Sequence, residues 1–285
     1  MEIILDEGAG FCFGVERALK MAGEESNRAS APIVTIGPLI HNPQVIEQMK
    51  RDGIEVVQEG EDVHDTVSII RTHGIRPQEE DRLRREGNQV LDATCPYVKK
   101  SHQYAELLCN EEYHIIVIGD PNHPEIKGIL GYAGERVTVI NQPEEADSLP
   151  HYAKAGIVVQ TTYPIEKVQK VVARLIERST ELRIFNTICD YTSDRQISAR
   201  GISAQVDLMY VVGGRNSANT NKLAEICQQQ GTTTRHIEVA EEIDSADLEN
   251  VNRIGITAGA STPDGRIASV IDRLEEIAAT LQHQT

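Results

Sequence analysis

Short apolar runs alternate with amphipathic stretches along the whole chain. The runs are four or five residues long and several end at glycine, as in IVTIG (33–37), IIVIG (115–119) and YVVGG (210–214). Runs of this kind are typical of buried parallel strands, and the stretches between them have helical periodicity. Because strands that alternate with helices form right-handed βαβ units, the sequence predicts an α/β fold with parallel sheets.

This pattern occurs three times, and a cysteine opens each copy. Cys12, Cys95 and Cys189 are separated by 83 residues (95 − 12) and 94 residues (189 − 95), and the segments EIILDEGAGFC, NQVLDATC and LRIFNTIC lead into them. Each cysteine is followed by a helical stretch and then by two strand–loop–helix units. We therefore expect three similar lobes in a pseudo-threefold trefoil around a central cavity. The predicted lobes are 1–94, 95–188 and 189–285.

Polar residues follow the strands at equivalent places in each predicted lobe. They are His41-Asn42, Asn122-His123 and Asn216-Ser217 after one strand, and Thr72-His73, Thr161-Thr162 and Ser261-Thr262 after the next. Ligands of parallel sheets bind beyond the carboxyl ends of the strands, and helix N-termini favour phosphate groups. The imidazoles at 41, 73 and 123, the hydroxyls at 217 and 261 and the amide of Asn219 can all donate hydrogen bonds to phosphate. The alternative for any single histidine or serine here is a helix cap or a structural group.

The three opening cysteines are candidate metal ligands. Five cysteines with no C-x-x-C pair are too few for a disulfide scaffold, whereas thiolates bind soft metals and iron–sulfur clusters. Three thiolates would hold one 4Fe–4S cluster and leave one iron without a protein ligand, so that this iron can bind a substrate oxygen. Zinc is the alternative metal, although these long spacings fit no zinc finger. Cys109 and Cys227 lie on apolar helical faces and are interpreted as buried structural residues.

Two further polar residues are candidates for catalysis. Glu125 follows His123 in NHPEIKG, and a carboxyl group at the mouth of a dry cavity is a proton donor with a raised pKa. The alternative is a solvated glutamate in a first helical turn. Thr161, in VVQTTYP, is placed to hold a substrate hydroxyl or, alternatively, to cap a loop.

The composition limits the partners of the chain. The 285 residues carry a net charge of -16, which disfavours nucleic-acid binding because phosphate backbones are repelled. No signal peptide is apparent, and no apolar run approaches the ~20 residues that span a bilayer. We therefore expect a soluble, cytoplasmic protein that binds neither nucleic acid nor membrane.

Eight motifs in order resemble the 4-hydroxy-3-methylbut-2-enyl diphosphate reductase family, whose members catalyse the last step of the non-mevalonate isoprenoid pathway. The motifs are GFCFGVERA, IGPLIHNPQVI, IIRTHG, LDATCPYV, IGDPNHPEIKG, VVQTT, GGRNSANTNKLAEI and ITAGASTPD. The resemblance implies a trefoil around a 4Fe–4S cluster and the reduction of an allylic alcohol diphosphate, with loss of water, to isopentenyl and dimethylallyl diphosphates. A ferredoxin or flavodoxin would supply the electrons.

The resemblance also implies roles for individual residues. The cluster ligands would be Cys12, Cys95 and Cys189. The diphosphate site would comprise His41, His73, His123, Ser217, Asn219 and Ser261. Glu125 would donate a proton, Thr161 would hold the substrate hydroxyl, and His123 would lie beside them in the catalytic group.

The chain departs from the family pattern at two places. Ala218 stands where a second serine is common, and Tyr191-Thr192 stand where an alanine–threonine pair is common. Two other functions are alternatives: a trefoil enzyme similar to quinolinate synthase, and a non-catalytic iron–sulfur sensor. A sensor usually carries a partner-binding or DNA-binding element, and the acidic sequence shows none.

Overall fold

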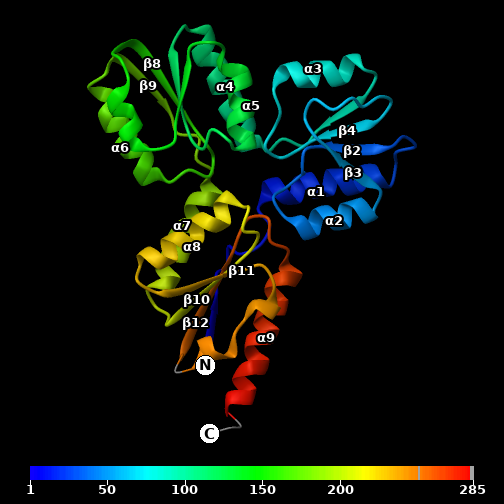
Figure 1. Cartoon of the computed structure of the whole chain (residues 1–285), viewed down its shortest axis with the longest axis vertical. Helices are drawn as coiled ribbons and strands as arrows, with labels where there is room; N and C mark the ends of the chain where they lie inside the picture. The colour runs from blue at the N-terminus through cyan, green and yellow to red at the C-terminus, as the bar shows by residue number, and fades with distance from the viewer. Residues whose placement is uncertain (250, 283–285) are drawn as a thin grey trace. The chain divides into compact units, whose positions relative to one another are not determined.

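A computed structural model describes residues 1–249 and 251–282 of the chain (Figure 1). These residues divide into two compact units. Unit 1 comprises Met1–Glu16, His41–Val45 and the described chain from Asp190 onward, and unit 2 comprises Arg17–Ile40 and Ile46–Cys189. Among the described residues, no helix has both the length and the hydrophobicity needed to cross a membrane.

Unit 2 contains two four-stranded sheets. The first has the order β3-β2-β4-β5 and is built from β2 (Ile33–Ile36), β3 (Ile54–Val57), β4 (Val67–Ile70) and β5 (Gln89–Asp92). The second has the order β7-β6-β8-β9 and is built from β6 (His114–Ile118), β7 (Val137–Ile140), β8 (Tyr152–Val159) and β9 (Ser179–Phe185). The helices that follow these strands or precede them are α1 (Phe13–Ser26), α2 (Pro43–Arg51), α3 (Pro77–Arg85), α4 (Pro96–Asn110), α5 (Pro124–Ala133) and α6 (Ile165–Ile176).

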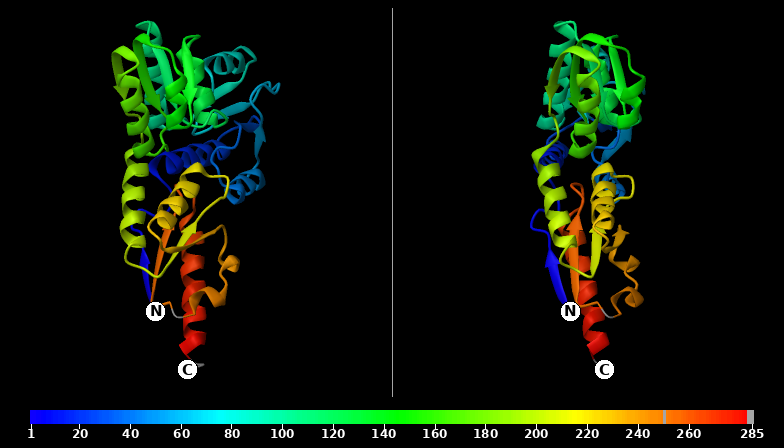
Figure 2. Two further views of the ribbon diagram at one scale, coloured as in Figure 1. Left: turned by 60° about the vertical axis from the view of Figure 1, so that its left-hand side comes forward. Right: turned by 90° about the vertical axis from the view of Figure 1, so that its left-hand side faces the viewer.

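Unit 1 contains the third sheet, of order β11-β10-β12-β1. Its strands are β1 (Glu2–Leu5), β10 (Leu208–Val212), β11 (Thr233–Ile237) and β12 (Arg253–Ala258), and its helices are α7 (Asp190–Ser203), α8 (Ala218–Gln229) and α9 (Asp264–Gln282). Figure 2 shows α9, in red, alongside this sheet. Val270 and Leu274 of α9 belong to the same hydrophobic core as Tyr210 and Ile256 of the sheet.

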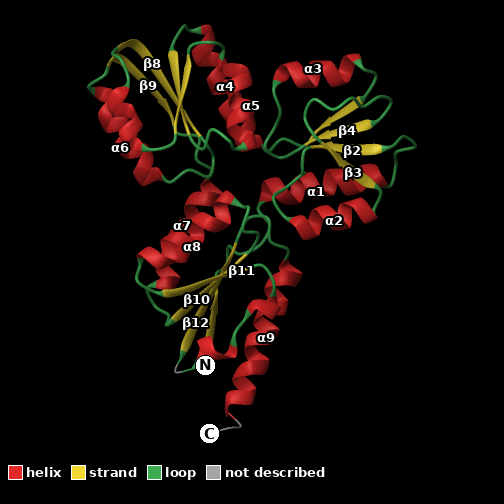
Figure 3. Ribbon diagram, viewed as in Figure 1, coloured by secondary structure: helices red, strands yellow, loops and turns green. Residues whose placement is uncertain are grey.

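All three sheets are parallel and share one strand order, which confirms the predicted α/β class (Figure 3). In the third sheet, the fourth strand is β1, whose Glu2 pairs with Arg253. The first strand of the chain therefore completes the sheet of the last segment, although the sequence was divided with residues 2–5 in the first lobe. The boundaries 1–94, 95–188 and 189–285 stay a prediction.

Burial of the central strands explains their apolar sequences. In the second sheet of unit 2, Ile116 and Ile157 face a core that includes Val171 of α6, whereas Ile115 and Val158 face a core with residues of α4 and α5. Since helices cover both faces, alternate positions of β6 and β8 must both be apolar. The fourth strands β1, β5 and β9 lie at sheet edges and are partly exposed.

Candidate functional site

Each of the three predicted metal ligands follows the fourth strand of its sheet and is held by an equivalent hydrogen bond. The Cys12 amide donates to the carbonyl of Ala260 at 3.1 Å, the Cys95 amide to that of Thr72 at 3.0 Å, and the Cys189 amide to that of Thr161 at 2.9 Å. Each acceptor lies two residues beyond the third strand of the same sheet. The cysteines thus occupy one structural position in three copies, at the carboxyl ends of the strands where ligands bind.

No disulfide joins any of the five cysteines, but their surroundings differ. Cys12, Cys95 and Cys189 are partly exposed, each at the start of a helix, and Cys95 occupies the N-cap position of α4 ahead of Pro96. Cys227 is buried in the core of unit 1, and burial raises the pKa of its thiol to about 11. Cys109 packs at the margin of the core around α4 and α5. The structural interpretation of these last two cysteines agrees with their packing.

Glycine makes the turn that leads from β2, β6 and β10 to the polar loop that follows each of these strands. The amides of Gly37, Gly119 and Gly213 donate to the last carbonyls of the neighbouring strands, at 2.7, 2.9 and 2.9 Å. Gly37 and Gly213 have positive φ angles of 72° and 146°, and a β-carbon at Gly119 would lie 2.5 Å from Ile126. These turns place His41, His123 and Ser217 four residues further on, at the starts of helices.

Helix capping accounts for part of this pattern. His123 caps α5 because its Nδ1 accepts from the Glu125 amide at 3.2 Å, and Ser217 caps α8 by accepting from the Thr220 amide at 3.4 Å. In α2, Asn42 accepts from the Val45 amide at 3.1 Å, so His41 is the residue before the cap. Since Nδ1 of His123 is an acceptor, the neutral ring carries its proton on Nε2 and can donate from that nitrogen.

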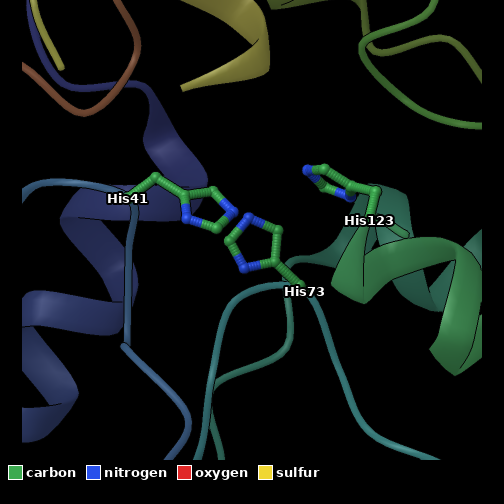
Figure 4. A group of neighbouring side chains, drawn as sticks. All are labelled: His41, His73 and His123. Atoms are coloured by element: carbon green, nitrogen blue, oxygen red, sulfur yellow. The ribbon is translucent and has the colours of Figure 1, made fainter. Parts of the chain in front are cut away.

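His73 and His123 lie together in unit 2. Their rings meet edge to face with centroids 5.3 Å apart (Figure 4). Internal bonds hold the His73 loop: the Thr72 hydroxyl donates to Leu39 at 2.9 Å and Arg71 donates to the carbonyl of Gly74 at 3.3 Å. Two predicted phosphate ligands from different sheets of unit 2 are therefore neighbours.

The predicted phosphate ligands of unit 1 are held by a second set of bonds. Asn42 donates to the carbonyl of Ser261 at 2.7 Å, and the Ser261 hydroxyl donates to the carbonyl of His41 at 3.2 Å. Asn219 is 6% exposed, and within the described part of the chain neither Nδ2 nor Oδ1 of its side chain has a hydrogen-bond partner. A buried amide without partners costs ~1–3 kcal/mol, so this side chain fits a site that a polar ligand completes.

Glu125 and Thr161 form the most distinctive pair of unit 2. Glu125 is 1% exposed; its Oε1 accepts from the Thr161 amide at 2.7 Å and its Oε2 from the Thr161 hydroxyl at 2.9 Å. Burial raises the pKa of this carboxyl group to about 7, although both bonds from Thr161 act in the opposite direction. The alternative of a solvated glutamate is therefore wrong, and a pKa of about 7 keeps part of this carboxyl group protonated near neutral pH.

Several supporting residues were not singled out from the sequence. Asp6 is buried beside the Cys12 loop and accepts from Ser198 at 2.7 Å, Thr257 at 2.6 Å and the amide of Gly8 at 3.1 Å. His102, interpreted from the sequence as a surface or structural residue, is buried in α4. An acidic residue directly after an apolar strand is the signal that marks Asp6, whereas no sequence signal marks His102.

Comparison with known proteins shows the family of the chain. Residues 3–275 match the model of the LytB protein family. The chain belongs to the LytB family. A relative from Syntrophotalea carbinolica, 4-hydroxy-3-methylbut-2-enyl diphosphate reductase, is 45% identical over 97% of this chain and 99% of its own length. The protein of that name from Geobacter sulfurreducens is 44% identical over 97% of this chain and 98% of its own.

Two solved structures of LytB relatives have the same fold. One, of (E)-4-hydroxy-3-methyl-but-2-enyl diphosphate reductase, is 41% identical, covers 97% of this chain and 100% of its own, and has a TM-score of 0.73. The other, of E-1-hydroxy-2-methyl-but-2-enyl-4-diphosphate reductase from Plasmodium falciparum, is 29% identical, covers 95% of this chain and 87% of its own, and has a TM-score of 0.91. The family predicted from the eight motifs is confirmed.

Proposed function

We propose that this LytB protein is a 4-hydroxy-3-methylbut-2-enyl diphosphate reductase, which forms isopentenyl and dimethylallyl diphosphates in the non-mevalonate pathway. Full-length relatives with that activity in their names support the assignment. Within the structure, the observation that carries it is the link from Glu125 through Thr161 to Cys189. Thr161 donates twice to the buried carboxylate and accepts from the Cys189 amide, so one residue joins the proton donor to a cluster ligand.

An iron–sulfur cofactor fits the thiols of the chain. LytB reductases are iron–sulfur enzymes, and Cys12, Cys95 and Cys189 are partly exposed cysteines, outside any disulfide, with one shared backbone geometry. These three would hold a 4Fe–4S cluster, and the buried, protonated Cys227 would not. When bound, the cluster would supply single electrons and an iron without a protein thiolate for the substrate oxygen. The three lobes would be arranged as a trefoil that brings these thiols to one central cavity.

The diphosphate would be held by hydrogen bonds from histidine, serine and asparagine side chains. The residues are His41, His73, His123, Ser217, Asn219 and Ser261. His123 offers a donor nitrogen at the start of α5, and Asn219 offers a buried amide without a partner among the described groups. Because the chain has a net charge of -16, local donors at helix N-termini must overcome an unfavourable long-range field.

Glu125 would deliver a proton to the departing hydroxyl group. The overall reaction breaks a carbon–oxygen bond, consumes two electrons and two protons, and releases water. A protonated Glu125 can donate to the Thr161 hydroxyl, which passes its own proton to the substrate oxygen, so hydroxide leaves as water. Burial keeps bulk solvent from this carboxyl group and holds its proton until transfer.

Electrons would arrive one at a time from a ferredoxin or flavodoxin in the cytoplasm. A fold similar to quinolinate synthase and a non-catalytic sensor were the alternatives from the sequence. The match to one reductase family over residues 3–275 favours neither of them.

Anaerobic turnover tests the proposal. The protein, purified without oxygen and supplied with reduced methyl viologen, should convert 4-hydroxy-3-methylbut-2-enyl diphosphate to both isoprenoid diphosphates with loss of one water. Product formation is measured by mass spectrometry and dye oxidation by absorbance. Iron-loaded protein that oxidises no dye with this substrate would refute the assignment, and dehydration of a quinolinate precursor instead would favour the rival enzyme.

A further inference from the structure

We propose that His102, which belongs to neither the predicted cluster ligands nor the predicted diphosphate ligands, is a positioning residue that holds the His73 loop against α5 in the arrangement that binds diphosphate. The inference rests on the proposed function, because diphosphate binding is the property that this packing is expected to control. The residues involved all belong to unit 2.

His102 lies in α4, two helical turns after Cys95, and is 5% exposed. Its ring stacks on Tyr132 of α5 with centroids 4.5 Å apart and an angle of 18° between the planes. The imidazole is therefore fixed between the helix that begins after a predicted cluster ligand and the helix that begins at His123. Aromatic stacking of this kind gives a side chain one preferred orientation.

Two glycines leave the space that this ring fills. A β-carbon at Gly74 would lie 2.6 Å from Cε1 of His102, and a β-carbon at Gly128 would lie 3.0 Å from Nε2. The β-carbon position at Gly128 also lies 3.4 Å from the carbonyl oxygen of His73, and the β-carbon position at Gly74 lies 3.3 Å from the methyl carbon of Thr94.

One imidazole thus packs against two segments of the predicted site, because Gly74 directly follows His73 and Gly128 lies one turn beyond Glu125 on the same helix. Thr94, which directly precedes Cys95, lines the same cavity as His102. Protein interiors are close-packed, so a side chain wedged between rigid segments sets their separation. Removal of the ring would take away this support and let the His73 loop change its position relative to His123.

The charged groups around His102 and its burial indicate that the ring acts through packing and not through proton transfer. The facing groups are Asp92 and Lys99, which form an ion pair, together with Glu80, Glu106 and Tyr132, around a cavity of about 170 Å³. Burial lowers the pKa of the imidazole to about 4, with Asp92 and Lys99 acting in opposite directions. The ring is therefore neutral at neutral pH, and its buried Nε2 has no hydrogen-bond partner among the described groups.

Size complementation tests the proposal. In the anaerobic holoenzyme, H102A is expected to weaken the binding of inorganic pyrophosphate about tenfold, which is what the loss of one hydrogen bond from a displaced ligand produces. G128A should also weaken binding, because its new methyl group would lie 3.0 Å from Nε2 of His102 and crowd the ring. In the double variant the methyl group enters vacated space, so the affinity should return toward that of the wild type.

Leu108→Ala is the matched control. Leu108 is fully buried in the same helix but packs against Gly156 of β8, so its truncation lowers stability without touching the His73 loop. Calorimetry gives the pyrophosphate dissociation constant, turnover gives kcat and KM, and thermal unfolding gives Tm. We expect Leu108→Ala to lower Tm only, whereas H102A raises the dissociation constant and KM more than it lowers kcat.

Nuclear magnetic resonance separates failure of the inference from failure of the proposed function. The Cε1–H resonances of His73 and His123 report their packing without any ligand, and they should shift in H102A and G128A but not in Leu108→Ala. An inactive wild type would reject the reductase assignment, while these resonances would still decide the positioning role. Unchanged resonances in G128A, or equal losses of affinity in H102A and Leu108→Ala, would overturn the proposal.

Discussion

Replacement of Glu125 by glutamine removes the proposed proton donor and keeps its shape. The amide oxygen of glutamine can still accept from the Thr161 amide. The NH2 group can donate to the Thr161 hydroxyl, so the second contact remains with donor and acceptor exchanged. General acid catalysis contributes ~10²–10⁴-fold to rate, so kcat should fall by about that factor. Iron content and pyrophosphate affinity should stay within about twofold of the wild type, because the change removes no proposed ligand.

The same substitution should change how stability depends on pH. The folded-state pKa of Glu125 is raised from 4.5 to about 7, so between these values the unfolded chain releases a proton that the folded chain retains. Stability contributed by this group is present below about pH 4.5 and is lost as pH rises toward 7. At 1.36 kcal/mol per unit, the ionised carboxyl group costs up to about 3 kcal/mol above pH 7.

Glu125→Gln removes that cost. The variant should therefore gain up to about 3 kcal/mol relative to the wild type at pH 8, and the gain should disappear near pH 4.5. Anaerobic thermal unfolding between pH 4.5 and 8 measures it, alongside kcat at each pH. Glu166→Gln is the control, because Glu166 is also in a first helical turn but is exposed. Turnover by Glu125→Gln within about threefold of wild type would reject the acid role, and a stability difference that does not vary with pH would reject the raised pKa.

Two other substitutions test separate parts of the site. Asn219→Leu should raise the free energy of unfolding of the ligand-free protein by about 1 kcal/mol, because it removes a buried amide without partners among the described groups. It should also weaken pyrophosphate binding about tenfold. Lower stability with unchanged binding would contradict the assignment of Asn219 as a diphosphate ligand. Asp6→Asn should destabilise the protein by ~1–3 kcal/mol, because an amide cannot accept all three hydrogen bonds that this carboxylate accepts. Unfolding midpoints in urea measure the change. A change under about 0.5 kcal/mol would show that these three hydrogen bonds contribute little to stability.

The apolar runs were sufficient to predict the central strands, because burial on both faces leaves a continuous hydrophobic sequence. They did not indicate β3, β7 and β11, whose residues are only partly buried at the sheet edges. Nor did they indicate the partner of β1, since the pairing of Glu2 with Arg253 depends on tertiary contacts between the two ends of the chain.

Repetition was the informative signal for the site. Three equivalent cysteines and three equivalent strand-ending glycines could be aligned by eye, and the structure gives each set one repeated hydrogen bond. The sequence left open whether Glu125 is buried or solvated and did not indicate burial of His102, because burial depends on residues distant in sequence. The cap formed by His123 shows that a structural role and a proposed binding role can coincide in one ring, through its two different nitrogens.

Iron and acid-labile sulfide counted per chain after anaerobic purification test the central claim most directly. The account predicts about four of each in the wild type, and loss of the intact cluster in Cys12→Ser, Cys95→Ser and Cys189→Ser alike. Cys227→Ser, which removes a buried core thiol, should keep the full count. A wild-type count near zero under these conditions, or a full cluster in any of the first three variants, would contradict it.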